Sequence, residues 1–338
     1  MTAAKSSTEP APRLTVAMSV YNNGPYVGAA IDSILEQSFR DFEFLIVNDG
    51  STDESASVID SRAARDNRIR VIHQENRGFI ASLNRLFSEA RSPWIARMDG
   101  DDVSHRERLA RQVAFVDANP GHGVVGCAAS LIGPDGEPLE KDGGAKPLDH
   151  EGIVANLESR PLINHNAALM ARDPVLKLGG YRAAYSHCED YDLWMRLIDH
   201  VKFATLPEAL IAYRVYPGQV SNRHLVEQAR NAAISWQARL ERLAGRPDPT
   251  EGLDRLPPLD EIDALFGREG VAAYVRMRVV NRMLYSPEAL GGDGYRILLD
   301  HIGEEGAERR YWRAAARLLK SGRAREAAGV AGALMRAG

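Results

Sequence analysis

Short apolar runs alternate with helical patterns between residues 14 and 118. The runs are rich in aliphatic and β-branched residues, which is typical of buried strands, and the segments between them carry apolar residues at helical spacing. The predicted strands are Leu14–Val20, Phe42–Val47, Ile69–His73 and Trp94–Met98. The predicted helices are Tyr26–Gln37, a segment that follows Asp53, Phe79–Ala90 and His105–Ala118. This alternation predicts an α/β fold with a doubly wound, mostly parallel sheet.

Beyond residue 118, further strands are predicted first and only helices afterwards. The later strands are Val124–Ile132, Asn164–Met170, Phe203–Leu206 and Leu210–Tyr213. Residues 140–150 are rich in Gly, Lys and Asp and predict a loop. From about Leu225 the pattern is helical, with a proline-bearing interruption at 247–258.

These patterns divide the chain into three regions. Residues 1–12 are small and polar and predict a disordered leader. Residues 13–224 contain the alternating strands and helices, and residues 225–338 are helical. We therefore expect an α/β domain followed by a helical C-terminal region.

Composition excludes several classes of protein. The 338 residues carry a net charge of -4, and this mild acidity argues against a nucleic-acid binder. The two cysteines, Cys127 and Cys188, are too few for a disulfide scaffold and suit a reducing cytoplasm. No apolar run approaches the roughly 20 residues of a membrane-spanning helix, and the first residues lack the apolar core of a signal peptide. We expect a cytoplasmic protein.

Three carboxylates surround a glycine where the fourth predicted strand ends. Asp99, Asp101 and Asp102 flank Gly100, which allows a sharp turn. Carboxylates crowded this closely repel one another, and a bound Mg²⁺ or Mn²⁺ would remove that repulsion and hold a substrate phosphate. The alternative is a solvated acidic turn that only ends the strand.

Polar clusters follow all four predicted strands of the first part of the chain. They are residues 21–23, 48–53, 75–78 and 99–102. Ligands of open α/β sheets bind beyond the carboxyl ends of the strands, so the four clusters predict one site. The clusters also include or adjoin bulky or charged residues, such as Tyr21, Arg77 and Arg97. Such residues favour a ligand-binding site over turns that only connect the strands to the helices.

An acidic pair begins a later helical segment. Glu189 and Asp190 precede Leu193, Trp194 and Leu197, which form an apolar helical face. One interpretation is an N-terminal acidic cap, because the helix macrodipole favours negative charge there. The other is a catalytic base.

Five motifs in this order resemble glycosyltransferase family 2, the inverting nucleotide-sugar enzymes with the GT-A fold. The resemblance covers about Leu14 to Ser221, and the C-terminal tail lies outside it. The motifs are Ser19–Asn23, Ile46–Asp53, Asn76–Gly78, Asp99–Asp102 and Glu189–Asp190. The second is close to the usual Asp-Asp-Gly-Ser-Thr-Asp, although Asn48 replaces the first acid, and the first lacks a proline common there.

The resemblance implies a nucleotide-diphospho-sugar donor and a divalent cation, Mn²⁺ or Mg²⁺. The residues implied in donor binding are Tyr21, Asn23, Asp49, Arg77, Arg97 and Asp99. Asp101, with Asp99, would hold the metal. Tyr21 and Asn23 would line the base pocket, and Asp49 would bind the base or the ribose. Arg97 or Arg77 would offset the charge that develops on the departing nucleoside diphosphate.

The resemblance also implies the catalytic residues and the reaction. Asp190 would be the general base that deprotonates an acceptor hydroxyl, and Glu189 is the second candidate. The acceptor would be a glycan or a lipid-linked glycan, in polysaccharide or glycoconjugate assembly. We expect Asp49, Asp101 and Asp190 to converge at one edge of the sheet. The roles of His165, His187 and His224 stay open.

Two other functions remain open from the sequence. A sugar nucleotidyltransferase usually has a Gly- and Arg-rich phosphate loop near the N-terminus, which residues 21–25 do not provide. A non-catalytic nucleotide-sugar-binding protein would not need both Asp101 and Asp190.

The C-terminal 33 residues are basic. Residues 306–338 contain Tyr311 and Trp312, and eight Lys or Arg against two Glu. Basic amphipathic helices lie on anionic lipid, which predicts peripheral association with the inner face of the cell membrane. The alternative is the solvated face of a helical hairpin.

Overall fold

The computed structural model describes residues 11–142, 148–159, 163–216, 224–286 and 288–338. The chain forms two compact units. The first comprises Met1–Tyr181 and Arg196–Tyr216, and the second comprises Arg182–Met195 and Pro217–Gly338. Residues 1–10 of the expected leader lie outside the described residues. The expected boundaries at residues 12 and 224 stay predictions, and segment 182–195 belongs with the C-terminal helices.

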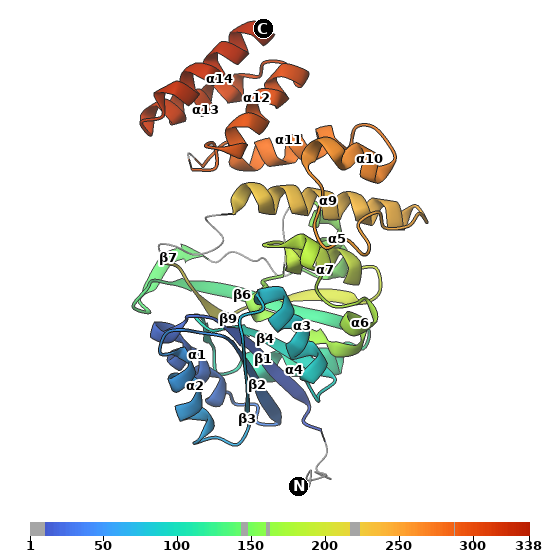
Figure 1. Cartoon of the computed structure of the whole chain (residues 1–338). Coiled ribbons are helices and arrows are strands. Elements are labelled where there is room, and N and C mark those ends of the chain that lie inside the picture. The colour runs from blue at the N-terminus through green and yellow to red at the C-terminus, as the bar shows by residue number, and fades with distance from the viewer. Residues whose placement is uncertain (1–10, 143–147, 160–162, 217–223, 287) are drawn as a thin grey trace. The chain divides into compact units, whose positions relative to one another are not determined.

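The first unit contains the predicted parallel sheet. Strands lie in the order β3-β2-β1-β4, and each neighbouring pair is parallel (Figure 1). Their bounds are β1 Leu14–Val20, β2 Phe42–Asp49, β3 Ile69–Gln74 and β4 Trp94–Asp99. The connecting helices are α1 Gly24–Leu35, α2 Ser55–Ala63 and α3 Phe79–Glu89, followed later by α4 Arg108–Ala118. The alternation predicted from apolar periodicity is confirmed here.

Both faces of this sheet are covered by helices, as expected for a doubly wound fold. Leu14, Val16 and Met18 of β1 belong to one core cluster with apolar residues of α1, α2 and α4. The alternate residue Ala17 is also buried, and α3 packs against β1 and β2. Since successive strand residues point to opposite faces, helices bury both sides of β1.

The rest of the sheet is mixed rather than parallel. It continues from β4 in the order β8-β6-β9-β5, with β7 beside β6. The bounds are β5 Val103–Ser104, β6 His122–Ile132, β7 Pro138–Asp142, β8 Leu169–Ala171 and β9 Lys202–Arg214. Strand β8 is antiparallel to β4 and β6, whereas β9 is parallel to β6.

Three predictions in this region are corrected. The strand predicted at 164–170 is a 3₁₀ turn, His165–Ala167, before the short β8, because the backbone turns at Asn164. The two strands predicted at 203–206 and 210–213 are the single strand β9. Its register against β6 shifts between Leu206 and Ala209, so an irregularity absorbs Pro207 and Glu208.

The loop predicted at 140–150 is the third correction. Its start is the end of β7, and its last residue begins α5, His150–Asn156. Residues 143–147 lie outside the described residues. A short helix, α6 (Arg172–Lys177), follows β8.

The second unit is helical with its own apolar core. Its helices are α9 Leu225–Leu243, α10 Ile262–Phe266, α11 Val271–Met283, α12 Asp293–Glu305, α13 Arg309–Lys320 and α14 Ala324–Ala337. Ala184 and Tyr185 belong to the same core cluster, which explains why segment 182–195 belongs to this unit. Helix α7, Glu189–Leu197, begins in this segment. No helix in the described part of the chain is long and apolar enough to cross a bilayer.

Candidate functional site

The carboxyl ends of β1 to β4 lie side by side in register. Val20 is paired with Asn48, and Ser19 is paired with Asp99. Asp49 is paired with Gln74 of β3. The four polar clusters therefore follow neighbouring strands at one edge of the sheet, as the sequence predicted.

Hydrogen bonds join the loop after β1 to the loop after β2. The Asn22 N–H donates to Ser51 Oγ at 3.0 Å, and the Thr52 N–H donates to Asn22 Oδ1 at 2.8 Å. Asn22 has a positive φ of 54°, a conformation that asparagine tolerates better than most residues. The neighbouring Tyr21 side chain is 50% exposed, so an aromatic face is available to a ligand.

Glycines allow the other loops to pack closely at this edge. Gly50 has φ +73°, and a Cβ there would lie 2.6 Å from the backbone nitrogen of Asn76. A Cβ on Gly100 would lie 3.3 Å from Asn23 Oδ1. Asn23 thus lies against the acidic turn. Its predicted place in the base pocket stays a prediction.

Asp49 has a structural role that the sequence did not reveal. Its Oδ1 accepts hydrogen bonds from Gln74 Nε2 at 2.7 Å and from the Arg77 N–H at 2.9 Å. Its Oδ2 accepts from the Gly78 N–H at 2.9 Å. Asp49 is 2% exposed and holds the loop after β3, while the Arg77 side chain is exposed. Its predicted role as a nucleotide ligand stays a prediction.

The three carboxylates of the acidic turn form a compact cluster. Oxygens of Asp99, Asp101 and Asp102 lie within 4.8 Å of one another. Arg97 Nη1 pairs with Asp99 Oδ2 at 2.5 Å, and the Tyr216 hydroxyl donates to Asp101 Oδ2 at 2.9 Å. This cluster contains both residues predicted to hold the metal.

Asp102 lies deepest and supports the turn. It is 1% exposed, accepts from the Arg214 N–H at 2.8 Å, and accepts a second hydrogen bond from the Asn166 amide. Arg214 Nε also donates to the Asp101 carbonyl at 2.7 Å. The end of β9 therefore fixes the backbone of the acidic turn.

Burial and mutual repulsion oppose ionisation in this cluster. Burial, with the neighbouring charge of Asp99, raises the pKa of Asp101. The same causes, with the charge of Asp101 added, raise the pKa of Asp102. A hard divalent cation binds carboxylate oxygens and would offset the repulsion among these three carboxylates.

Arg97 lies beside this cluster and is 3% exposed. Burial opposes its charge, but the Asp99 carboxylate outweighs burial and raises the pKa of the guanidinium. Its Nε has no partner among the described residues, and its guanidinium lies 5.4 Å from the ring centroid of the exposed Phe79. A buried cation next to the acidic turn can stabilise an anionic ligand.

His165 is half-buried beside Tyr181. Its Nε2 lies 2.7 Å from the Tyr181 hydroxyl, and burial lowers its pKa well below the ordinary value. The contact with Tyr181 and the lowered pKa favour a structural role for His165, whose role the sequence left open.

Sequence reasoning missed three residues that hold the acidic turn: Asn166, Arg214 and Tyr216. Polar residues inside the predicted strand at 164–170 were a local sign that Asn166 has a polar partner. No local pattern linked Arg214 or Tyr216 to Asp101, because more than 100 residues separate them.

The acidic pair Glu189–Asp190 begins α7, in the second unit. Glu189 is buried, and Asp190 Oδ1 accepts from the Tyr191 N–H at 2.7 Å. Asp49 and Asp101 belong to the first unit, so the expected convergence of the three carboxylates stays a prediction.

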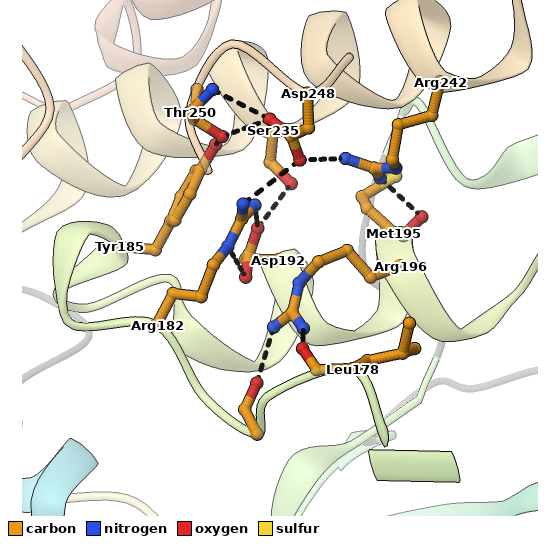
Figure 2. A network of polar contacts seen from close by, with 11 residues as sticks. Leu178, Arg182, Tyr185, Asp192, Met195, Arg196, Ser235, Arg242, Asp248 and Thr250 are labelled. Atoms are coloured by element: carbon orange, nitrogen blue, oxygen red, sulfur yellow. Dashed lines mark hydrogen bonds and ion pairs between the residues drawn. The ribbon is translucent and has the colours of Figure 1, made fainter. Parts of the chain in front are cut away.

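A buried polar network anchors the start of α7 (Figure 2). Asp192 is fully buried, and its Oδ2 accepts from Arg182 Nε at 2.9 Å. Arg182 also pairs with Asp248 at 3.1 Å, and Asp248 pairs with Arg242 of α9 at 2.5 Å. Two residues from Asp190, the helix is thus held by charged groups of the second unit.

Comparison with known proteins identifies the family. A model of the family described as Glycosyl transferase family 2 matches residues 15–173. The O-antigen biosynthesis glycosyltransferase WbnJ of Escherichia coli is 32% identical over 207 residues, which cover 60% of this chain and 80% of WbnJ. The chain belongs to glycosyltransferase family 2. This glycosyltransferase is therefore an enzyme of the class that the motifs predicted.

Solved structures confirm the GT-A fold. TarS 1–349 of Staphylococcus aureus has a TM-score of 0.57 at 15% identity, covering 96% of this chain and 90% of that one. The mannosyltransferase PcManGT of Pyrobaculum calidifontis, in complex with GDP-Man and Mn²⁺, has a TM-score of 0.52 at 20% identity, covering 97% and 87%. At these identities the similarity establishes the fold.

Proposed function

We propose that this glycosyltransferase moves a sugar from a nucleotide-diphosphate donor to an acceptor hydroxyl, with inversion at the anomeric carbon. The observation that supports this most is the cluster of Asp99, Asp101 and Asp102 at the carboxyl ends of the parallel strands. The proposed setting is assembly of a polysaccharide, a lipid-linked glycan or a glycoconjugate. The similarity to an O-antigen enzyme supports this setting.

The nucleotide would bind against the loops after β1 and β2. Tyr21 offers an exposed aromatic face for the base, and Asn23 lies against the acidic turn. Asp49 would accept a hydrogen bond from the base or the ribose while it holds the loop of Arg77 and Gly78. A carboxylate oxygen has more than one acceptor position, so the two roles are compatible.

Asp101, with Asp99, would hold Mn²⁺ or Mg²⁺, and Asp102 would keep their turn in place. The presence of Mn²⁺ in the PcManGT complex supports a divalent cation. When bound, the cation would neutralise diphosphate charge and stabilise the leaving nucleoside diphosphate. Arg97, buried beside Asp99, would add positive charge from the protein side, and the exposed Arg77 would reach the diphosphate from the loop.

Asp190 would act as the general base on the acceptor hydroxyl, with Glu189 as the second candidate. The first turn of α7 carries both, and the buried pair of Asp192 and Arg182 fixes that turn. A base that is held in one position lowers the entropic cost of reaching the reactive geometry. The oxygen would then attack the anomeric carbon from the face opposite the diphosphate.

The decisive experiment compares Asp101→Asn with the wild type in donor hydrolysis and transfer assays with Mn²⁺. We expect turnover to fall by about 100-fold or more, because the variant loses a carboxylate that would hold the cation against the diphosphate. Asp41→Asn is the matched control and should keep full activity, because Asp41 is exposed and precedes β2, at the opposite end of that strand from Asp49. Undiminished turnover by Asp101→Asn would contradict the proposal, as would release of pyrophosphate from a nucleoside triphosphate.

We also propose that the enzyme works in the cytoplasm and that α13 contacts the inner face of the membrane. Tyr311 and Leu318 are buried in the helical core, whereas Trp312 is 45% exposed and Leu319 is 62% exposed. Arg309, Arg313 and Lys320 are exposed on the same helix. An outward face with basic, aromatic and aliphatic side chains suits anionic lipid.

Co-sedimentation with phosphatidylserine-containing vesicles tests the membrane proposal. Deleting residues 306–338 would remove core residues, so the double variant Arg313→Glu/Lys320→Glu is preferable. We expect it to bind more weakly, by about 1 kcal/mol for each basic residue removed. The control, Arg65→Glu/Arg111→Glu, makes the same charge change at exposed sites of the first unit. Equal binding by both double variants would contradict the proposal.

A further inference from the structure

Two histidines and a glutamate of the second unit form a cluster that the proposed transfer reaction does not use. His187 precedes α7, His224 precedes the first residue of α9, and Glu227 lies in the first turn of α9. One possible ligand atom from each lies within 4.8 Å of the other two. Glu227 Oε2 is 3.9 Å from His187 Nε2 and 3.6 Å from His224 Nδ1.

The local backbone holds the two imidazole rings together. His187 has a positive φ of 60°, which is uncommon for a residue other than glycine and carries a conformational cost. Its ring stacks on that of His224, with centroids 3.6 Å apart and planes 16° apart. His224 and Glu227 are three residues apart at the start of α9, so their side chains lie on the same side. The uncommon conformation of His187 thus completes a three-residue group.

The chemistry of this group differs from that of the acidic turn. Two imidazole nitrogens and one carboxylate oxygen are a frequent ligand set for Zn²⁺, whereas all-oxygen sets suit Mg²⁺, Ca²⁺ and Mn²⁺. All three side chains are partly exposed, at 28%, 38% and 45%, so an ion has access from solvent.

We propose that His187, His224 and Glu227 form a second metal site that binds Zn²⁺ and uses no residue of the acidic turn. The ligand atoms need to approach one another by about 1 Å, since tetrahedral Zn²⁺ has ligands at about 2.0–2.1 Å. The two rings must also rotate out of their stacked arrangement, because the metal-binding lone pair of each nitrogen lies in the plane of its ring. Rotation about the side-chain bonds of the two histidines supplies both changes. Three protein ligands leave the fourth position to water.

A bound zinc ion would connect the start of α7 to the start of α9. His187 lies two residues before Glu189 and three before Asp190. The ion would therefore restrain the backbone that carries the proposed base. This consequence rests on the proposed function, whereas the metal site itself does not.

The test is a calorimetric titration of the full-length chain with Zn²⁺ alone, after treatment with EDTA. Asparagine replaces each histidine, because it tolerates the positive φ at 187 and is a favourable helix N-cap at 224. We expect His187→Asn and His224→Asn to weaken zinc binding by roughly tenfold or more. His200→Asn, at an exposed histidine, is the control and should bind zinc as the wild type does.

A second variant and a second metal keep the test decisive. Glu227→Gln preserves the helix and the side-chain volume, so it replaces any histidine variant whose circular dichroism shows loss of fold. Asp101→Asn should keep the zinc site, and Co²⁺ bound at this site should give a visible absorption band that His224→Asn removes. Unchanged zinc affinity in the ligand variants, or loss of the site in Asp101→Asn, would overturn the proposal. Because the readout is binding, this result is independent of sugar transfer.

Discussion

Glu43 of β2 shows how a single buried carboxylate is stabilised away from the site. It is 2% exposed and accepts hydrogen bonds from Thr15 Oγ1 at 2.7 Å, and from the Arg91 N–H and Nε at 2.8 Å each. Burial opposes ionisation of Glu43, but these hydrogen bonds and the Arg91 charge outweigh it, so the pKa lies below its ordinary value of 4.5. The ionised form therefore stabilises the fold.

The direction of this pKa shift gives a pH-dependent prediction. Since the pKa is lower in the folded than in the unfolded chain, the stabilisation is fully present above the unfolded value and is lost as the pH falls through the folded value. We expect Glu43→Gln to lower the free energy of unfolding by about 1–2 kcal/mol at about pH 7, and by less at about pH 3. Urea titrations at both pH values measure this. Glu36→Gln, at an exposed residue, should show no such dependence, and an equal loss at both pH values would contradict the account.

At the scale of elements, the loops after β2 and β3 depend on each other. Gly50 presses against Asn76, and Asp49 accepts the backbone N–H groups of Arg77 and Gly78. The motif that resembles the family pattern therefore does more than supply ligand groups. It also sets the shape of the neighbouring loop, which the sequence alone did not indicate.

The start of α7 depends on a different kind of contact, the buried pair of Asp192 and Arg182. The Asp192 side chain is 0% exposed and that of Arg182 is 15% exposed, so removing one partner leaves a charge in a poorly solvated place. We expect Asp192→Ala to lower the free energy of unfolding by about 3 kcal/mol in urea titrations.

The matched control for Asp192→Ala is Asp293→Ala. Asp293 also pairs with an arginine, but its side chain is 80% exposed and that of Arg296 is 75% exposed. Solvent screens such a pair, so the loss should stay below about 1 kcal/mol. If both variants lose a similar free energy of unfolding, burial does not determine how much the Asp192–Arg182 pair contributes to stability.

At the scale of the whole molecule, the chain has two units with separate apolar cores, and the acidic turn belongs to the first. A ligand that binds only the folded state raises stability by mass action, by about 2.7 kcal/mol at 100 times its Kd. We expect UDP or GDP with Mn²⁺ to raise the melting temperature more than the nucleotide does without the metal.

Asp101→Asn should lose the part of this increase that depends on Mn²⁺ and keep the melting temperature of the unliganded protein within a few degrees. Asp41→Asn should keep both. Differential scanning fluorimetry measures all three proteins under the same conditions. If the melting temperature of Asp101→Asn rises with Mn²⁺ as much as that of the wild type, Asp101 is not a ligand of the metal.

The sequence by itself determined the parallel half of the sheet and the edge at which its loops meet. Apolar periodicity is a local property, and it fixed β1 to β4 and the helices between them. The motifs in those loops then placed Tyr21, Asn23, Asp49, Asp99 and Asp101 at that edge, because parallel strands end on the same side.

Tertiary structure decided which polar atoms meet across long stretches of chain. Asp102 is held by Asn166 and Arg214, which lie 64 and 112 residues away, and β9 continues through Pro207 because its pairing with β6 absorbs the irregularity. His187, His224 and Glu227 likewise come together only in the folded second unit. Such contacts depend on the packing of entire elements, and no local pattern of residues encodes them.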